Sequence, residues 1–218
     1  MPVNSLLLFF VISLFFAAML QVHLFNIAFA KLGLTPEISL FLLLGTLLGS
    51  GINLPLYSVN IKETGHLVMS PDRKLIWEIF QPVREGKIVV AINVGGCLIP
   101  VGLCLYFISL QVIGPIDIIV GVLAITALSY KFSRLIPGLG VGMPVFLAPL
   151  TSALVAMILD PVHTAHLAYI SGVFGVLIGA DILRLKTIAG LGAPVASIGG
   201  AGTFDGIFMT GIIAALLA

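Results

Sequence analysis

The chain has 218 residues, of which 60% are hydrophobic and only 9% are charged. Soluble domains carry roughly 25% charged residues, so this composition excludes an ordinary soluble domain. The formal net charge of +1 also argues against nucleic acid as a partner. Apolar runs of about 20 residues recur, as in transmembrane helices and unlike the short alternating segments of membrane barrels. We therefore expect an all-α integral membrane protein with one polytopic domain over residues 1–218, and the lipid bilayer as its surroundings.

Seven membrane spans are expected in chain order. Their approximate bounds are 5–29, 37–57, 88–111, 116–130, 145–159, 165–183 and 203–218. The first is interpreted as a retained span and not a cleaved signal peptide, because no Lys or Arg precedes it and its apolar run is long. Glycines and prolines interrupt spans two and three and lead into span seven, which is typical of broken or closely packed membrane helices.

Residues 59–87 form the longest polar segment of the chain. A turn sequence, Ser-Pro-Asp-Arg, lies in its middle, and the flanks are rich enough in β-favouring residues to predict a small hairpin insertion. A short amphipathic helix through Trp77 and Phe80 is the alternative. In either form Trp77 suits the boundary between membrane and water.

Positive charges indicate how the spans are oriented. With the seven spans above, nine of the ten Lys and Arg residues fall in the loops after spans two, four and six, and only Lys31 falls on the opposite side. Cytoplasmic loops of membrane proteins carry an excess of Lys and Arg. We therefore expect the N-terminus and the 59–87 insertion in the cytoplasm and the C-terminus outside, in a multi-pass protein of the cell inner (cytoplasmic) membrane.

Two acidic residues near the end of the chain are the candidate site. Asp181 lies near the end of span six and Asp205 lies near the start of span seven, after Thr203 as the expected N-cap, with a glycine-rich stretch between the two acids. A charged group within a bilayer costs about 2.5–3.5 kcal/mol on insertion scales, so it persists mainly where it pairs or has a function. Asp181 also has a structural interpretation, an ion pair with Arg184 three residues later.

The hairpin of spans six and seven would bring the two carboxylates to the same side of the membrane. Two close carboxylates share a proton, which is the state that an aspartyl hydrolase needs, with Asp181 and Asp205 as its catalytic residues. The same pair suits a proton or cation relay. The candidate catalytic residues are thus also candidate relay residues.

Asn53 and Asn93 each lie beside a Gly/Pro break and are candidates for a polar path with Asp205 and Thr203. Hydrogen bonds between packed helices are the structural alternative for both asparagines. His163, His166 and Asp160 resemble a metal-binding group, but no further Cys or Glu is close in sequence, so we expect neither a metal nor another cofactor.

Two resemblances add to this picture. The runs GSGINLP, INVGGCLIP, GADIL and SIGGAGTFDGIFMTGIIAALLA resemble an uncharacterised family of small multipass proteins from bacteria and archaea, defined only as a domain of unknown function. That resemblance implies a membrane protein and no particular activity. Separately, Gly179-Ala180-Asp181 is similar to the glycine–any–glycine–aspartate motif of presenilin-like and prepilin-peptidase-like proteases, which implies a catalytic role for Asp181. Ala180 departs from the motif, and the second acid follows the motif where those families have it before.

Three functions follow from these observations. The leading hypothesis is an intramembrane aspartyl-type hydrolase acting on a membrane-embedded peptide. The alternative is a small proton- or ion-coupled transporter or channel, and the second alternative is a non-catalytic membrane assembly factor. The sequence does not decide whether the protein is an enzyme, nor does it fix the substrate or the oligomeric state.

Overall fold

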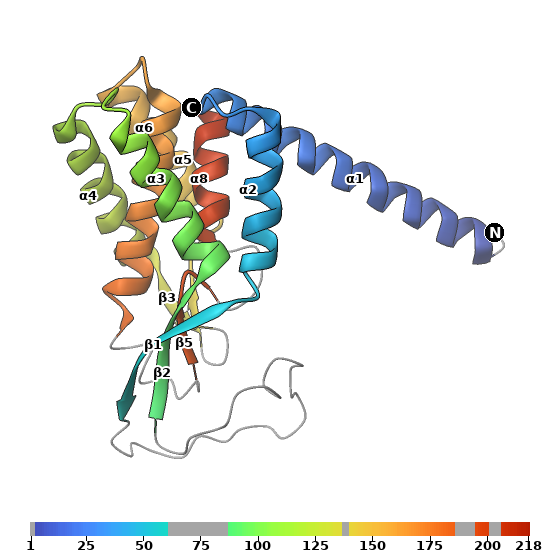
Figure 1. Ribbon diagram of the computed structural model, residues 1–218, viewed down its shortest axis with the longest axis horizontal. Helices are drawn as coiled ribbons and strands as arrows, with labels where there is room; N and C mark the ends of the chain where they lie inside the picture. The colour runs from blue at the N-terminus through green and yellow to red at the C-terminus, as the bar shows by residue number, and fades with distance from the viewer. Residues whose placement is uncertain (1–2, 61–86, 137–139, 186–194, 201–205) are drawn as a thin grey trace.

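In the computed structural model, residues 3–60, 87–136, 140–185, 195–200 and 206–218 are described. A bundle of helices forms one end of the molecule and a small β-sheet forms the other, while one long helix projects from the side (Figure 1). The described α-helices are α1 (Val3–Lys31), α2 (Pro36–Gly49), α3 (Ile99–Ser109), α4 (Pro115–Phe132), α5 (Leu147–Leu159), α6 (Thr164–Val176) and α8 (Gly206–Leu217). Two π-helical segments extend this set, η2 (Val94–Leu98) before α3 and η3 (Leu177–Ile182) after α6.

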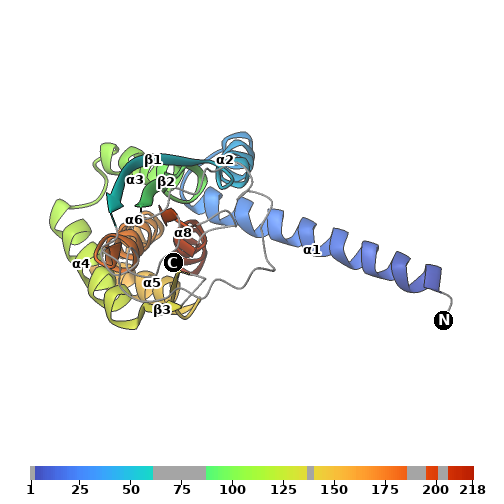
Figure 2. The same ribbon diagram turned by 90° about the horizontal axis from the view of Figure 1, so that it is seen from below.

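Helix α6 lies among its neighbours at the centre of the bundle, with α4, α5, α8 and α3 around it (Figure 2). Its inner residues include Leu167, Tyr169 and Ile170, all fully buried. Tyr169 packs edge-on against Phe107 of α3, with ring centroids 5.7 Å apart. Exposed apolar side chains instead cover the outer faces of α4 and α5, such as Leu123 and Ile158. Apolar residues both inside and outside the bundle are the pattern of a membrane protein.

The β-sheet has three strands in the order β1 (Asn53–Asn60), β2 (Lys87–Asn93) and β5 (Val195–Ile198). Strands β1 and β2 are antiparallel, with Asn53 opposite Asn93 and a bulge between Pro55 and Tyr57. Strand β5 is parallel to β2, with Val89 opposite Val195. A separate two-stranded hairpin, β3 (Arg134–Ile136) and β4 (Gly140–Gly142), connects α4 to α5. We call the end of the bundle that carries these strands the sheet end.

The structure confirms a mainly helical chain but corrects the all-α assignment. Spans two and three were expected to be helical over 37–57 and 88–111, yet residues 53–60 and 87–93 are strands. Ile88, Val89, Val90 and Ile92 are β-branched residues, which favour a pleated strand, and Gly49 and Gly51 precede the strand that follows α2. The paired strands thus lie on either side of the predicted hairpin, whose residues 61–86 are outside the described part of the chain.

Glycines set the spacing of α4 against α6 and η3. A Cβ atom at Gly175 would lie 2.5 Å from the Cβ of Ile125, and one at Gly179 would collide with the backbone carbonyl of Thr126. Glycines therefore let the two helix backbones approach closely, which is the usual packing of helices in membranes. The same effect at Gly95 brings η2 against the end of α2, where a Cβ atom would meet the carbonyl oxygen of Thr46.

Three of the described helical segments are long and apolar enough to cross a membrane: Ile12–Lys31, Pro115–Phe132 and Thr164–Ile182. The remaining apolar helices are shorter, and two of them, α2 and the η2–α3 segment, adjoin strands. Helix α1 leaves the bundle over most of its length (Figure 1). Its C-terminal part packs on α8, where Phe25 and Phe29 contact Phe208 at ring-centroid distances of 6.1 and 6.5 Å.

Candidate functional site

Asp181 lies in η3, the π-helical continuation of α6 at the sheet end. Its Oδ2 atom accepts a hydrogen bond from the backbone N–H of Gly199, at 2.8 Å. Gly199 directly follows β5, so this bond joins two segments that are 18 residues apart in sequence. Isolated π-helical turns are frequent at functional sites because they shift the direction of the side chains that follow.

Gly199 has a backbone conformation that suits glycine alone. Its φ angle is +86°, and Gly200 follows with φ +87°. A Cβ atom at Gly199 would lie 2.6 Å from the Cβ of Cys97 and 2.8 Å from the Cys97 backbone nitrogen. Both the torsion and the space exclude a larger residue. The glycine therefore places its N–H against Asp181 while its other side packs on η2.

A pocket of about 250 Å³ opens beside Asp181. Its wall consists of η3, the start of α8 and the segment between β4 and α5, and includes Asp181, Thr210, Met143, Met209 and Gly206. Most of the remaining lining is apolar. Since one water takes about 30 Å³ of liquid volume, the pocket has room for several waters or a small ligand next to the carboxylate.

Arg184 does not pair with Asp181, contrary to the structural alternative. The guanidinium of Arg184 donates to the backbone oxygen of Tyr130 at 2.7 Å and to that of Ser133 at 3.3 Å. Its carbon Cζ also lies 4.3 Å from the centre of the Tyr130 ring. Arg184 thus binds the C-terminal end of α4, where free carbonyl groups attract a cation. Within the described part of the chain, Asp181 has no cationic partner.

Asp205 and Thr203 lie outside the described residues. Gly206, which follows Asp205 in the chain, begins α8 and lines the same pocket as Asp181. The structure therefore leaves the predicted pairing of the two carboxylates as a prediction.

Asn53 and Asn93 are brought together, as the first residue of β1 and the last residue of β2. The Asn93 side chain is 1% exposed. Its amide nitrogen donates to the Ser50 backbone oxygen at 2.7 Å and to Asn53 Oδ1 at 3.1 Å, and its own oxygen accepts from the Gly96 N–H at 2.7 Å. Asn53 Oδ1 also accepts from the Ser197 hydroxyl at 2.7 Å. These bonds cap η2 and join three strands, which favours the structural interpretation over the polar path.

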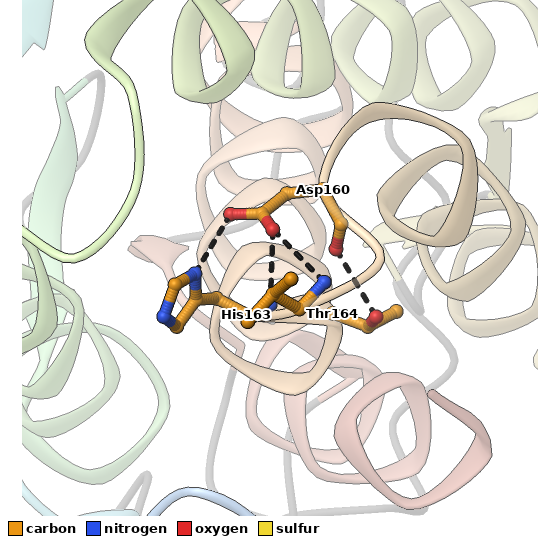
Figure 3. Close-up of polar contacts among 4 residues, drawn as sticks. Asp160, His163 and Thr164 are labelled. Carbon is orange, nitrogen blue, oxygen red and sulfur yellow. Dashed lines mark hydrogen bonds and ion pairs between the residues drawn. The ribbon is translucent and has the colours of Figure 1, made fainter.

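The opposite end of the bundle carries the turn with Asp160, His163 and Thr164 (Figure 3). Asp160 Oδ1 accepts from the backbone N–H groups of Val162 and His163 at 3.1 and 3.0 Å, while Oδ2 lies 3.1 Å from His163 Nδ1. Partial burial would raise the pKa of Asp160, but these hydrogen bonds outweigh it and lower the pKa below its ordinary value. The turn joins the end of α5 to the start of α6. In the described ranges, no three His, Cys, Asp or Glu side chains are grouped as for a metal ion.

Two features of the core were missed by the sequence interpretation. Small residues recur at every fourth position of α6 and η3 (Ser171, Gly175 and Gly179), a spacing that could have predicted the close contact with α4. In addition, four buried hydroxyl groups have no hydrogen-bond partner among the described residues: those of Thr126, Ser129, Ser152 and Tyr169. No sequence pattern identifies such groups, because they depend on how helices pack.

The chain was compared with known proteins. The family model described as "Protein of unknown function (DUF1614)" matches residues 47–217, which is more than half of the chain. The chain belongs to this family. The resemblance to an uncharacterised family is thereby confirmed, whereas the resemblance to aspartyl proteases receives no support. No curated protein and no solved structure matches the chain.

Proposed function

We propose that this DUF1614 protein is a multi-pass protein of the inner (cytoplasmic) membrane with its sheet end in the cytoplasm. The distribution of charge supports this orientation. Lys131, Arg134 and Arg184 lie at the sheet end, whereas Lys31 lies at the other end, where it donates to the Leu216 backbone oxygen at 2.8 Å. The N-terminus is then cytoplasmic and the C-terminus outside.

The function that we propose for the pocket is hydrolysis by an acid pair, Asp181 and Asp205. The observation that supports it is that Asp181 and Gly206, the residue after Asp205, line one pocket. Asp181 is available for chemistry, because Arg184 is engaged by α4. The pocket admits water to a carboxylate that sits among apolar residues, where two acids would share a proton.

In this mechanism one carboxylate takes a proton from water as the water oxygen attacks the carbonyl carbon of a peptide bond. The other carboxylate, which is protonated at the start, gives its proton to the carbonyl oxygen. As the C–N bond breaks, the first carboxylate passes the proton that it took from water to the leaving nitrogen, and the other carboxylate takes its proton back from a hydroxyl of the tetrahedral intermediate. A peptide within the membrane is the substrate class that fits a pocket at the end of a helix bundle. The N–H of Gly199 would hold the Asp181 carboxylate in place throughout.

The first test requires no substrate. Infrared spectroscopy of the full-length protein in nanodiscs, recorded as a function of pH, measures the protonation of carboxyl groups. Coupled acids titrate as a pair, so Asp181→Asn should change the titration of Asp205, and Asp205→Asn should change that of Asp181. The control is Asp117→Asn, at the start of α4 and outside the pocket. Independent titration of the two acids would refute the acid pair.

The second test uses single-span peptides with a fluorophore and a quencher, reconstituted with the protein in liposomes. Each Asp→Asn variant should lower cleavage by at least about 100-fold, since acid–base catalysis contributes about 10²–10⁴-fold. Ion flux that depends on Asp205 and survives Asp181→Asn would favour the transporter. If neither Asp181→Asn nor Asp205→Asn changes peptide cleavage or ion flux, a non-catalytic assembly factor is the function that remains.

A further inference from the structure

We propose that the C-terminal end of α4, at the sheet end of the bundle, binds the head group of an anionic phospholipid from the surrounding bilayer. The site consists of three cationic side chains, which we call the basic cluster: Lys131 near the end of α4, Arg134 at the start of β3 and Arg184 just after η3. It rests on the proposed placement in the membrane, with α4 crossing the bilayer, and it is independent of the acid pair.

Contacts of Arg184 with the end of α4 bring the three cations together. Arg184 Nε donates to Ser133 Oγ at 3.3 Å, and Arg184 Cζ lies 4.3 Å from the centre of the Tyr130 ring. Tyr130 directly precedes Lys131, and Ser133 directly precedes Arg134. The Arg184 guanidinium therefore lies against the same five-residue segment, 130–134, that carries the other two cations.

Arg184 also removes a source of repulsion for a phosphate group. Carbonyl oxygens at the C-terminal end of a helix carry partial negative charge. Two backbone oxygens at this end, those of Tyr130 and Ser133, accept hydrogen bonds from Arg184 Nη2 at 2.7 and 3.3 Å. A guanidinium has five N–H donors, and Arg184 Nη1 has no partner among the described residues. Its two N–H groups are available to phosphate oxygens, which arginine binds well.

The described acidic side chains do not neutralise the basic cluster. Three of them lie at the opposite end of the bundle: Glu37 in the first turn of α2, Asp117 in the first turn of α4 and Asp160 at the end of α5. Asp181 faces a pocket that has no residue of α4 in its wall. Within the described ranges, no cation of the cluster forms an ion pair. The end of α4 thus presents positive charge, which is complementary to an anionic head group.

The outer face of α4 offers a surface for the acyl chains of the same lipid. Helix α4 lies at the edge of the bundle (Figure 2). Exposed apolar residues recur every three or four positions along this helix and lead to Lys131, which is also exposed: Ile116, Val120, Leu123 and Ala127. Side chains at this spacing share one face of a helix. From Ile116 to Lys131 the helix rises by about 22 Å, more than the half-thickness of about 15 Å that the acyl chains of one leaflet fill.

Two exposed aromatic residues mark the level at which this face meets the head groups. Tyr130 and Phe132 are both exposed, and Lys131 Nζ lies 5.8 Å from the centre of the Phe132 ring. Aromatic side chains are enriched at the boundary between membrane and water, and basic groups between membrane helices on the cytoplasmic side bind anionic lipid head groups. An apolar strip that ends in aromatic and cationic residues fits a phospholipid, whereas a free phosphate would use the cations alone.

The test is native mass spectrometry of the full-length protein in detergent micelles, titrated with phosphatidylglycerol or with phosphatidylcholine of the same acyl chains. The wild type should bind phosphatidylglycerol at least about fivefold more tightly. Lys131→Gln and Arg134→Gln should each lower that affinity about fivefold, the effect of one Lys or Arg near an anionic membrane surface, and leave the affinity for phosphatidylcholine unchanged. Both side chains are exposed, so the melting temperatures of these variants should equal that of the wild type.

Lys31→Gln is the matched control, because it makes the same change at an exposed residue at the opposite end of the bundle. It should leave the affinity for phosphatidylglycerol unchanged. Equal wild-type affinity for the two lipids, or an equal loss in Lys31→Gln and Lys131→Gln, would overturn the site. Displacement of the lipid by an equal concentration of inorganic phosphate would overturn it in favour of a soluble anion.

A second measurement separates failure of this site from failure of the proposed membrane placement. Liposomes that contain the wild-type protein are washed at alkaline pH and recovered by flotation. Protein that floats with the liposomes but does not distinguish the two lipids would overturn the lipid site alone. Protein that the wash removes would overturn the membrane placement and the lipid site together.

Discussion

The two ends of the bundle hold an aspartate in different ways. At the turn between α5 and α6, Asp160 accepts hydrogen bonds from residues two and three positions further along the chain. At the sheet end, Asp181 accepts from Gly199, 18 residues away and in a different structural element. The first arrangement forms whenever the local turn forms. The second exists only when α6, β5 and η2 have assembled.

This difference in hydrogen bonding indicates different roles for Asp160 and Asp181. Asp160 satisfies the backbone N–H groups of Val162 and His163 in the turn just before α6, a local bonding pattern that is common for Asp in turns. Asp181 faces a pocket with few polar groups and keeps its place through a single described hydrogen bond. An acid that depends on tertiary contacts and borders a pocket is the better candidate for function, and substitutions can test whether the contrast holds.

The largest effect is expected from Gly199→Ala. The added methyl group would clash with Cys97 and force a non-glycine residue into a φ of +86°. We expect a loss of about 2–4 kcal/mol in the free energy of unfolding, because strained torsions and steric overlap each cost on the order of 1–3 kcal/mol. Reversible unfolding in SDS micelles measures this change.

Gly102→Ala is the control for that substitution. Gly102 lies within α3 with open space around its Cβ position. Alanine is a better helix former than glycine by about 1 kcal/mol, so this variant should be as stable as the wild type or more stable. If both variants unfold alike, Gly199 is not a constrained position and the assembled Asp181 site loses its structural basis.

A second substitution at the sheet end is Asn93→Ala. It removes a 1% exposed side chain and leaves the Ser50 backbone oxygen and the Gly96 N–H without their partner. We expect a loss of about 2 kcal/mol, within the range for unsatisfied buried groups. Asn53→Ala, which removes a more exposed partner, should cost less. Equal losses in the two variants would contradict the central position of Asn93 in the network.

Local patterns in the sequence were sufficient for much of the helical fold. The bounds 116–130 and 145–159 agree with α4 and α5 within two residues, because apolar length and flanking Pro, Gly and charged residues determine such helices locally. The sheet was mispredicted at 53–57 and 88–93 because its apolar strands continue the hydropathy of the adjacent helices. The bond from Gly199 to Asp181 could not be predicted at all, since a parallel strand pairing and a positive φ bring these groups together.

The smallest effect is expected at the far end, from Asp160→Ala. The substitution removes the acceptor of two N–H groups in an exposed turn, and the loss of such hydrogen bonds costs about 1 kcal/mol at neutral pH. The pKa of Asp160 is lowered in the folded protein, so its contribution is fully present above the ordinary pKa of 3.8 and is lost as the pH falls through the lower folded value. The difference in stability between wild type and variant should therefore shrink below about pH 4. A difference that stays constant from pH 7 to pH 3 would mean that the Asp160 charge contributes nothing, and the contrast with Asp181 would then rest on geometry alone.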